Sequence, residues 1–158
     1  MLSRVLMYWY AVTRTPIVGY QGDLEPWSAA FVSWLARSAG LTPEEFPSTV
    51  FHWDYIERFL RPGDGARFVA RDPLRYAPRV GDLVCVSRSD AVIDFASLRR
   101  GPYHCDIVVS ADAGAIEVVG GNVGDTVARA QFGVDERGLL VPRDDRPWVA
   151  VIEQRSPR

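Results

Sequence analysis

The chain has 158 residues and a formal net charge of −2. That size is typical of one domain, and the charge excludes the strongly basic composition of a nucleic-acid-binding protein. Hydrophobic residues make up 47% of the chain and charged residues 24%, so a buried core is expected and extensive disorder is not. We therefore expect a single domain over residues 1–158 and no nucleic-acid partner.

The first apolar run covers residues 5–12 and follows Arg4. It has about the length of the apolar part of a signal peptide, but no convincing cleavage site follows it. Its three adjacent aromatic residues favour a structural segment of the domain instead. No apolar stretch approaches the roughly 20 residues that a membrane span needs, so we expect neither a signal peptide nor a membrane span in this chain.

Two helices are predicted next. Residues 28–39 carry an apolar stripe at helical spacing, with Pro26 just before it and Gly40 as the stop. Residues 49–60 place Phe51, Tyr55 and Phe59 four residues apart, and Ser48 is available as the N-cap. Ser28 is therefore expected in the first turn of the first of these helices.

After residue 60 the sequence pattern changes from helical to extended. Residues 61–79 are rich in Pro, Gly and charge, which predicts a loop with one short element. Short β-rich runs follow at 80–86, 104–110, 115–119 and 148–152, with weaker candidates at 127–132 and 139–141. Helices followed by closely spaced strands predict an α+β fold, with N-terminal helices packed on a mostly antiparallel sheet of about five to six strands.

The chain has two cysteines, Cys85 and Cys105. Two cysteines far apart in sequence do not make a zinc site, so no metal is expected. They could form one disulfide in an oxidising compartment or remain reduced. Both lie in apolar runs, which favours two buried free thiols.

Three polar residues have the pattern of an acyl-transfer site. Ser28 lies at a helix start, among backbone N–H groups that can stabilise an oxyanion. His104 opens a strand after a long loop, and Asn122 follows Gly120 and Gly121. A nucleophile, a histidine and a third polar group are the components of such a site. Without further support, Ser28 could equally be a capping serine and Asn122 a turn residue.

The ordered set of motifs resembles the CHAP-type peptidoglycan amidases and peptidases, which have a papain-like fold. The resemblance covers about residues 5–153 and is carried by the helix motif Trp27-Ser28-Ala29-Ala30-Phe31-Val32, the run Pro78-Arg79-Val80-Gly81-Asp82, the strand from His104 and the turn Gly120-Gly121-Asn122. The chain looks closer still to a bacterial domain-of-unknown-function family related to CHAP, through Tyr8-Trp9, the serine form of the helix motif and His52-Trp53-Asp54.

The resemblance implies a catalytic set of Ser28 as nucleophile, His104 as general base and Asn122 as the orienting residue, with Trp27 and His52 on the cleft wall. Because Ser28 replaces a cysteine, its proton must leave during attack, and a carboxylate beside the histidine becomes valuable. Strand alternation returns Asp106 to the side of His104, and Asp125 follows Asn122, so these two carboxylates are the candidates.

The expected function is hydrolysis of an amide bond in bacterial peptidoglycan, without a metal or organic cofactor. Action in the periplasm, at the cell wall or after secretion would follow. Two alternatives remain: a muropeptide-binding module without catalysis, and an interbacterial toxin or phage lytic domain that an inhibitory protein could block. Ser28 itself could be an active nucleophile, a degenerate site or an engineered replacement of cysteine.

Overall fold

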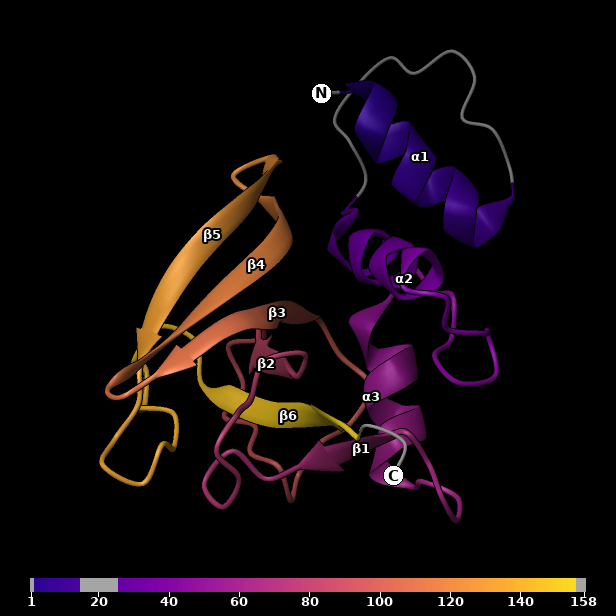
Figure 1. The fold of residues 1–158 in the computed structure, drawn as a ribbon. Helices are drawn as coiled ribbons and strands as arrows, with labels where there is room; N and C mark the ends of the chain where they lie inside the picture. The colour runs from indigo at the N-terminus through magenta and orange to yellow at the C-terminus, as the bar shows by residue number, and fades with distance from the viewer. Residues whose placement is uncertain (1, 15–25, 156–158) are drawn as a thin grey trace.

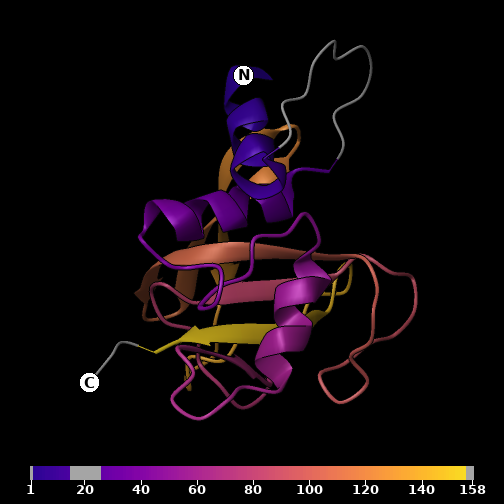
Figure 2. The same ribbon diagram turned by 90° about the vertical axis from the view of Figure 1, so that its right-hand side faces the viewer.

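A computed structural model of the chain describes residues 2–14 and 26–155. In these residues two helices, α2 (Ser28–Ser38) and α3 (His52–Leu60), pack on one face of a six-stranded sheet, and a third, α1 (Leu2–Thr13), packs on α2 (Figures 1 and 2). The strands are β1 (Phe68–Arg71), β2 (Leu83–Ser87), β3 (Tyr103–Asp112), β4 (Ala115–Val123), β5 (Thr126–Gly133) and β6 (Trp148–Gln154).

The sheet has the order β1-β6-β2-β3-β4-β5, and every neighbouring pair is antiparallel. The predicted α+β class and the mostly antiparallel sheet are thus confirmed. The short element expected between residues 61 and 79 is β1, and the weak candidate at 127–132 is β5. The run at 139–141 forms no strand; only an isolated bridge joins Leu140 to Val134.

Helix α1 confirms that residues 5–12 are a structural segment. Val5 and Tyr8 are buried, and Trp9 and Val12 pack against the same core, so these four make a stripe at helical spacing. The ring of Tyr8 stacks on Trp27 with centroids 5.7 Å apart. These contacts fix α1 on α2, next to the start of α2 (Figure 1).

Helix α3 begins later than predicted. Its N-cap is Phe51, without a side-chain cap, so Ser48 does not have the expected role. The preceding Thr49 lies outside the helix because its hydroxyl donates to Asp54 Oδ2 and its backbone N–H donates to Ser33 Oγ. This shift makes His52 the first residue of α3.

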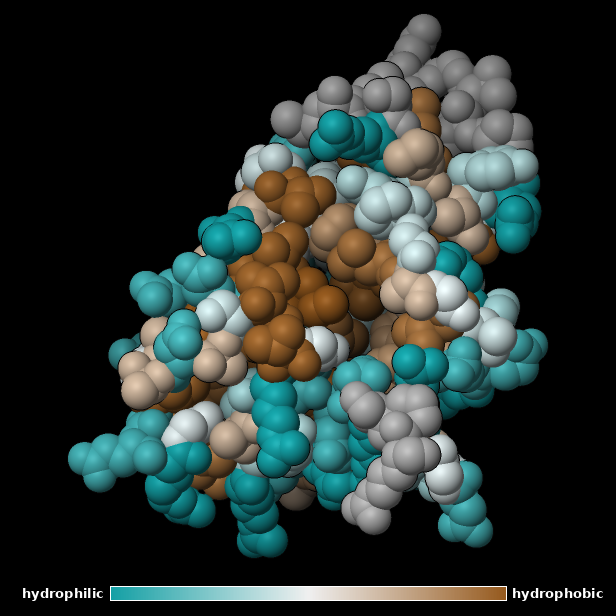
Figure 3. Space-filling model, viewed as in Figure 1, coloured by the Kyte–Doolittle hydropathy of each residue, from teal (hydrophilic) through white to brown (hydrophobic). Residues whose placement is uncertain are grey.

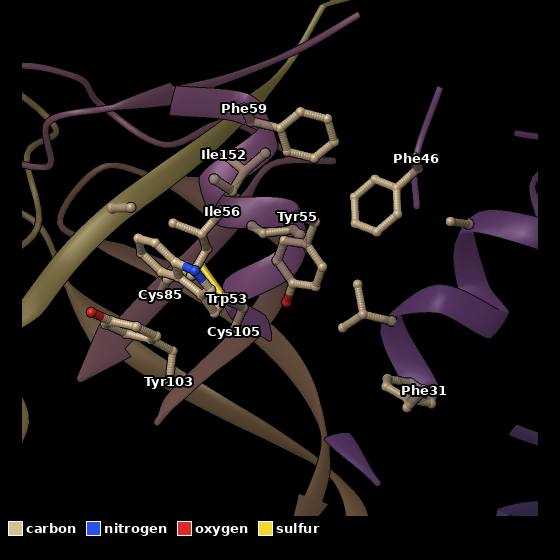
Figure 4. Packing of buried hydrophobic residues seen from close by; sticks show 14 of the residues in the cluster. Phe31, Phe46, Trp53, Tyr55, Ile56, Phe59, Cys85, Tyr103, Cys105 and Ile152 are labelled. Atoms are coloured by element: carbon tan, nitrogen blue, oxygen red, sulfur yellow. A yellow bond between two sulfur atoms is a disulfide. The ribbon is translucent and has the colours of Figure 1, made fainter. Parts of the chain in front are cut away.

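The main core lies between the helices and the sheet, and Figure 4 shows its aromatic centre around Phe46, Tyr55, Phe59 and Trp53. A second, smaller cluster covers the opposite face of the sheet. Its buried members are Val84, Val108, Ile116, Val118, Leu140 and Val151. Because residues on successive positions of a strand point to opposite faces, β2 and β3 contribute to both clusters.

The interpretation of the two cysteines as free thiols was wrong: Cys85 and Cys105 form a disulfide at the centre of the main core (Figure 4). The pairing of β2 with β3 places the two residues directly opposite each other. Neither the strand register nor the direct pairing is visible in a sequence separation of 20, which explains the error.

Removing this disulfide is expected to lower stability. The bond closes a loop of about 20 residues in the unfolded chain, so its loss should cost about 3 kcal/mol in the free energy of unfolding. Urea unfolding of the Cys85→Ala/Cys105→Ala variant would measure this. Reduced wild-type protein should match the variant, and equal midpoints for the oxidised wild type and the variant would contradict the bond.

Candidate active site

Ser28 is the first residue of α2, and its side chain does not cap the helix. The N-cap is Trp27, and it makes no side-chain cap hydrogen bond. Instead, Ser28 Oγ lies 2.7 Å from His52 Nε2, within hydrogen-bond distance. The simplest interpretation of Ser28, a serine kept only for capping, therefore does not account for its side chain.

His52 connects Ser28 to a third group. Its ring is 5% exposed, and its Nδ1 atom is hydrogen-bonded to the hydroxyl of Tyr55. His52 and Tyr55 are three residues apart on α3, so they share one face of the helix. The result is a continuous hydrogen-bonded chain from Ser28 through His52 to Tyr55, joining the starts of α2 and α3.

Burial determines the protonation of this chain. Burial lowers the pKa of His52 well below its usual 6.5, and the nearby His104 and the positive charge of Arg88 lower it further. Burial also raises the pKa of the Tyr55 phenol well above 10, with a smaller contribution from the Asp106 carboxylate. At neutral pH His52 is therefore an uncharged imidazole and Tyr55 a protonated phenol.

His104 and Asp106 form a second pair on β3. Nε2 of His104 lies 2.7 Å from Oδ1 of Asp106, so Asp106 lies beside His104, as strand alternation predicts. The rings of His104 and His52 have centroids 5.5 Å apart. Asp106 thus supports His104, whereas Ser28 contacts His52. In the described part of the chain no hydrogen bond joins Ser28 to His104.

Asn122 and Asp125 do not join these pairs. Asn122 is half-buried at a φ of 60°, and its side chain makes no hydrogen bond within the described residues. Asp125 is exposed and lies with Gly124 in the two-residue turn between β4 and β5, where both residues have positive φ. That geometry is typical of a hairpin turn. Asn122 thus lies near the end of β4 and Asp125 in the turn that follows, and neither side chain is hydrogen-bonded to Ser28 in the described structure.

A cleft of about 590 Å³ opens beside the Ser28–His52 pair. It lies between the starts of α2 and α3 and the long loop of residues 88–102, which projects at the right of Figure 2. Its lining includes Trp9, Pro26, Ser28, His52, Asp54, Arg88, Arg100 and Tyr103. His52 is on the cleft wall, as expected. Trp27 is 1% exposed and packs in the core instead.

A comparison with protein families decides the family of the chain. Residues 9–154 match the family described as "Uncharacterized protein conserved in bacteria (DUF2272)". The chain belongs to the DUF2272 family. The match covers the three helices and all six strands apart from the first residues of α1. No curated protein and no solved structure matches the chain.

The described residues of this DUF2272 chain contain neither a metal-binding group of side chains nor a membrane-spanning helix. Among residues 2–14 and 26–155, no three His, Cys, Asp or Glu side chains are grouped so that they could hold a metal ion. No helix in the same ranges is long and apolar enough to cross a membrane.

Sequence reasoning placed His52 on the cleft wall but missed its contact with Ser28, and it missed Tyr55 altogether. The chain has only two histidines, and the spacing from His52 to Tyr55 was a usable signal of a shared helix face. What no sequence pattern showed is that the two helix starts meet. That meeting depends on α2 and α3 packing on the same face of the sheet (Figure 2).

Proposed function

We propose that this protein is a hydrolase of amide bonds in bacterial peptidoglycan, with Ser28 as the nucleophile and His52 as its general base. The observation that carries the proposal is the 2.7 Å hydrogen bond between Ser28 Oγ and His52 Nε2 on the wall of the cleft. A serine bonded to a neutral imidazole, which a third group orients, is the arrangement of an activated hydroxyl nucleophile.

The first step is attack of Ser28 Oγ on the substrate carbonyl. In the productive tautomer, His52 Nδ1 carries the ring proton and donates a hydrogen bond to the Tyr55 oxygen. Nε2 is then free to accept the proton of Ser28. The resulting imidazolium then gives that proton to the leaving amine, and an acyl-serine ester remains. Water attacks this ester with Nε2 again as the base, and the acid product leaves.

Backbone N–H groups at the start of α2 are suited to hold the oxyanion. The first hydrogen bond of the helix runs from Phe31 N–H to the Trp27 carbonyl. The preceding N–H groups, from Ser28 to Ala30, therefore lie before the helical ladder begins. A negative charge that develops next to Ser28 would meet these donors at the positive end of the helix.

The pair of His104 and Asp106 lies beside the proposed base. The motif resemblance assigns the base to His104, whereas the hydrogen bond of Ser28 favours His52. The centroids of the two rings are 5.5 Å apart, and His104 lowers the pKa of His52, so the Asp106 carboxylate pairs with His104 and not with the proposed base. In the described structure this carboxylate contacts His104 directly and His52 only through space.

Two further features support the choice of substrate and compartment. The order of the Ser28, His104 and Gly120-Gly121-Asn122 motifs is that of CHAP-type enzymes, and helices packed on one antiparallel sheet are compatible with a papain-like fold. The Cys85–Cys105 disulfide is typical of proteins that work in an oxidising environment. Action in the periplasm, at the cell wall or outside the cell fits both.

The test is turnover of purified peptidoglycan and its muropeptide fragments, with products identified by mass spectrometry. Wild-type protein should release one acid and one amine product for each bond cut, and Ser28→Ala should release none. Ser38→Ala is the matched control, because Ser38 is an exposed serine at the other end of the same helix. Equal turnover by wild type and Ser28→Ala would refute the proposed mechanism.

A muropeptide-binding module without catalysis is the second candidate. Two observations favour it: no carboxylate in the described structure bonds His52, and Ser28 is only 4% exposed. This candidate predicts muropeptide binding without turnover. Ser28→Cys separates the two, because a strong gain of activity would indicate a degenerate cysteine site, whereas a loss would indicate a mechanism adapted to serine.

The route of delivery is a separate question. An interbacterial toxin or a phage lytic domain would use the same chemistry, and a toxin would be matched by an inhibitory protein. Such an inhibitor would have to cover the cleft beside Ser28. Expression in the periplasm of a bacterial host would check this, since a toxin should lyse the cells and Ser28→Ala should not.

A further inference from the structure

Two arginines line the proposed active-site cleft, Arg88 and Arg100. Arg88 follows the end of β2, and Arg100 precedes β3, so they stand at opposite ends of the long loop. The backbone N–H of Arg88 donates to the Pro102 carbonyl at 2.9 Å, which brings the two ends of the loop together. The two arginines therefore come from neighbouring parts of the cleft wall.

The base of the loop is held in place. The Tyr103 hydroxyl donates to the Arg99 carbonyl at 2.6 Å, and the Tyr103 ring stacks on Trp53 of α3 (Figure 4). Within the loop, Ile93 is buried in the main core. A loop anchored at its base and through its middle presents the two arginines on a fixed support.

Within residues 2–14 and 26–155 no ion pair neutralises the charges of these two arginines. Six other arginines form ion pairs with carboxylates: Arg67, Arg71, Arg75, Arg129, Arg143 and Arg155. Neither Arg88 nor Arg100 has such a partner among the described residues. The one carboxylate that lines the cleft in that part of the chain is Asp54, which accepts a hydrogen bond from Thr49. The described lining of the cleft thus carries two arginines and one carboxylate, and its positive charge exceeds its negative charge.

We propose that Arg88 and Arg100 bind a free carboxylate of the substrate, next to the amide bond that Ser28 attacks. The planar guanidinium group matches a carboxylate through two parallel hydrogen bonds. This inference rests on the proposed function. It specifies the class of substrate as peptides with a free acid close to the scissile bond. Neutral or amidated peptides would bind in the same cleft without this contact.

The test begins with binding, so that it does not depend on hydrolysis. Ser28→Ala protein is titrated by calorimetry with a muropeptide in its free-acid form and with the same muropeptide amidated at its carboxyl groups, at equal ionic strength. The free acid should bind about tenfold or more tightly than the amide, as expected for a charge-assisted hydrogen bond. Adding Arg88→Gln or Arg100→Gln should remove most of that difference.

Arg99→Gln is the matched control. Arg99 is exposed and adjacent to Arg100, but it does not line this cleft. It should keep the preference for the free acid. Equal binding of acid and amide, no binding of the acid, or the same loss in Arg99→Gln would overturn the inference. A retained acid preference without any turnover by the wild type would instead refute the proposed hydrolysis and leave the carboxylate site standing.

Discussion

Replacing His52 with glutamine is expected to lower muropeptide hydrolysis by at least about 100-fold, the usual minimum contribution of a general base. Glutamine can still bond the Ser28 hydroxyl, but it cannot accept its proton at neutral pH. Because Ser28 and His52 act as one unit, the double variant Ser28→Ala/His52→Gln should be no worse than either single variant. Initial rates of product release, followed by mass spectrometry, would measure all three.

The competing assignment makes His104 the base, and the same assay separates the two. If His52 is the base, His104→Gln should retain more activity than His52→Gln, because it leaves the hydrogen bond between Ser28 and His52 in place. Tyr55→Phe should lower the rate by about tenfold, the cost of one orienting hydrogen bond of about 1.4 kcal/mol. Full activity in His52→Gln together with loss in His104→Gln would transfer the role of base to His104.

The pH dependence of the reaction follows from the lowered pKa of His52. The neutral ring is the active form, so kcat/KM should rise with pH through the pKa of His52 in the folded protein. This rise should lie below pH 6.5. The positive charge of Arg88 contributes to the lowering. Arg88→Gln should therefore move the rise to higher pH, and a shift in the opposite direction would contradict the closeness of the two groups.

The same shift affects stability, with a definite sign. Between the lowered pKa of folded His52 and 6.5, the unfolded state binds a proton that the folded state does not. The free energy of unfolding should therefore fall as the pH falls through this window. His52→Gln should show a smaller loss of stability over the same range, as urea unfolding at several pH values would record.

The sequence predicted those parts of the fold that depend on local pattern. The apolar stripe of α2, the short element before β2 and most of the β-rich runs after residue 80 were assigned correctly in kind, whereas residues 139–141 form no strand. Residues 5–12 were expected to be a structural segment, without the assignment of a helix. Side-chain periodicity decides these features, and it can be read from neighbouring residues. The late start of α3 was missed because Thr49 bonds Ser33, which is distant in sequence.

In the candidate site, too, features within one segment were predicted and contacts between distant segments were not. Asp106 beside His104 follows from the alternation of one strand, and it was predicted. The contact of Ser28 with His52 depends on two helix starts that meet in space, and the Cys85–Cys105 disulfide depends on the register of two strands. No pattern within one segment contains that information. Tertiary packing, which propensity does not specify, produced both.

The two glycines at 120 and 121 had been interpreted as part of a turn, but they lie within β4. A Cβ atom added at Gly121 would lie 2.6 Å from Phe31 Cβ, and one added at Gly120 would lie 1.9 Å from Asp106 Oδ1. Gly121 therefore allows α2 to approach the sheet, and Gly120 makes room for the carboxylate that supports His104. The pair is required by close packing on both faces of β4.

Gly121→Ala is expected to destabilise the protein by about 1–3 kcal/mol, the usual cost of overpacking a core. Phe31 Cβ is fixed to the backbone of α2, so the helix that carries Ser28 must move to admit the methyl group. Urea unfolding would measure the loss of stability. Gly63→Ala is the control, because a Cβ there meets nothing within 4 Å and its φ is not positive.

Gly120→Ala should act differently, because the atom it meets first is the far end of a side chain. Asp106 can rotate away, so the loss of stability should be smaller than for Gly121→Ala, but the bond to His104 must break. Hydrolysis should then fall towards the level of Asp106→Asn. If both glycine variants unfolded at the wild-type urea concentration, the close approach of α2 to β4 would be refuted, and with it the position of Ser28.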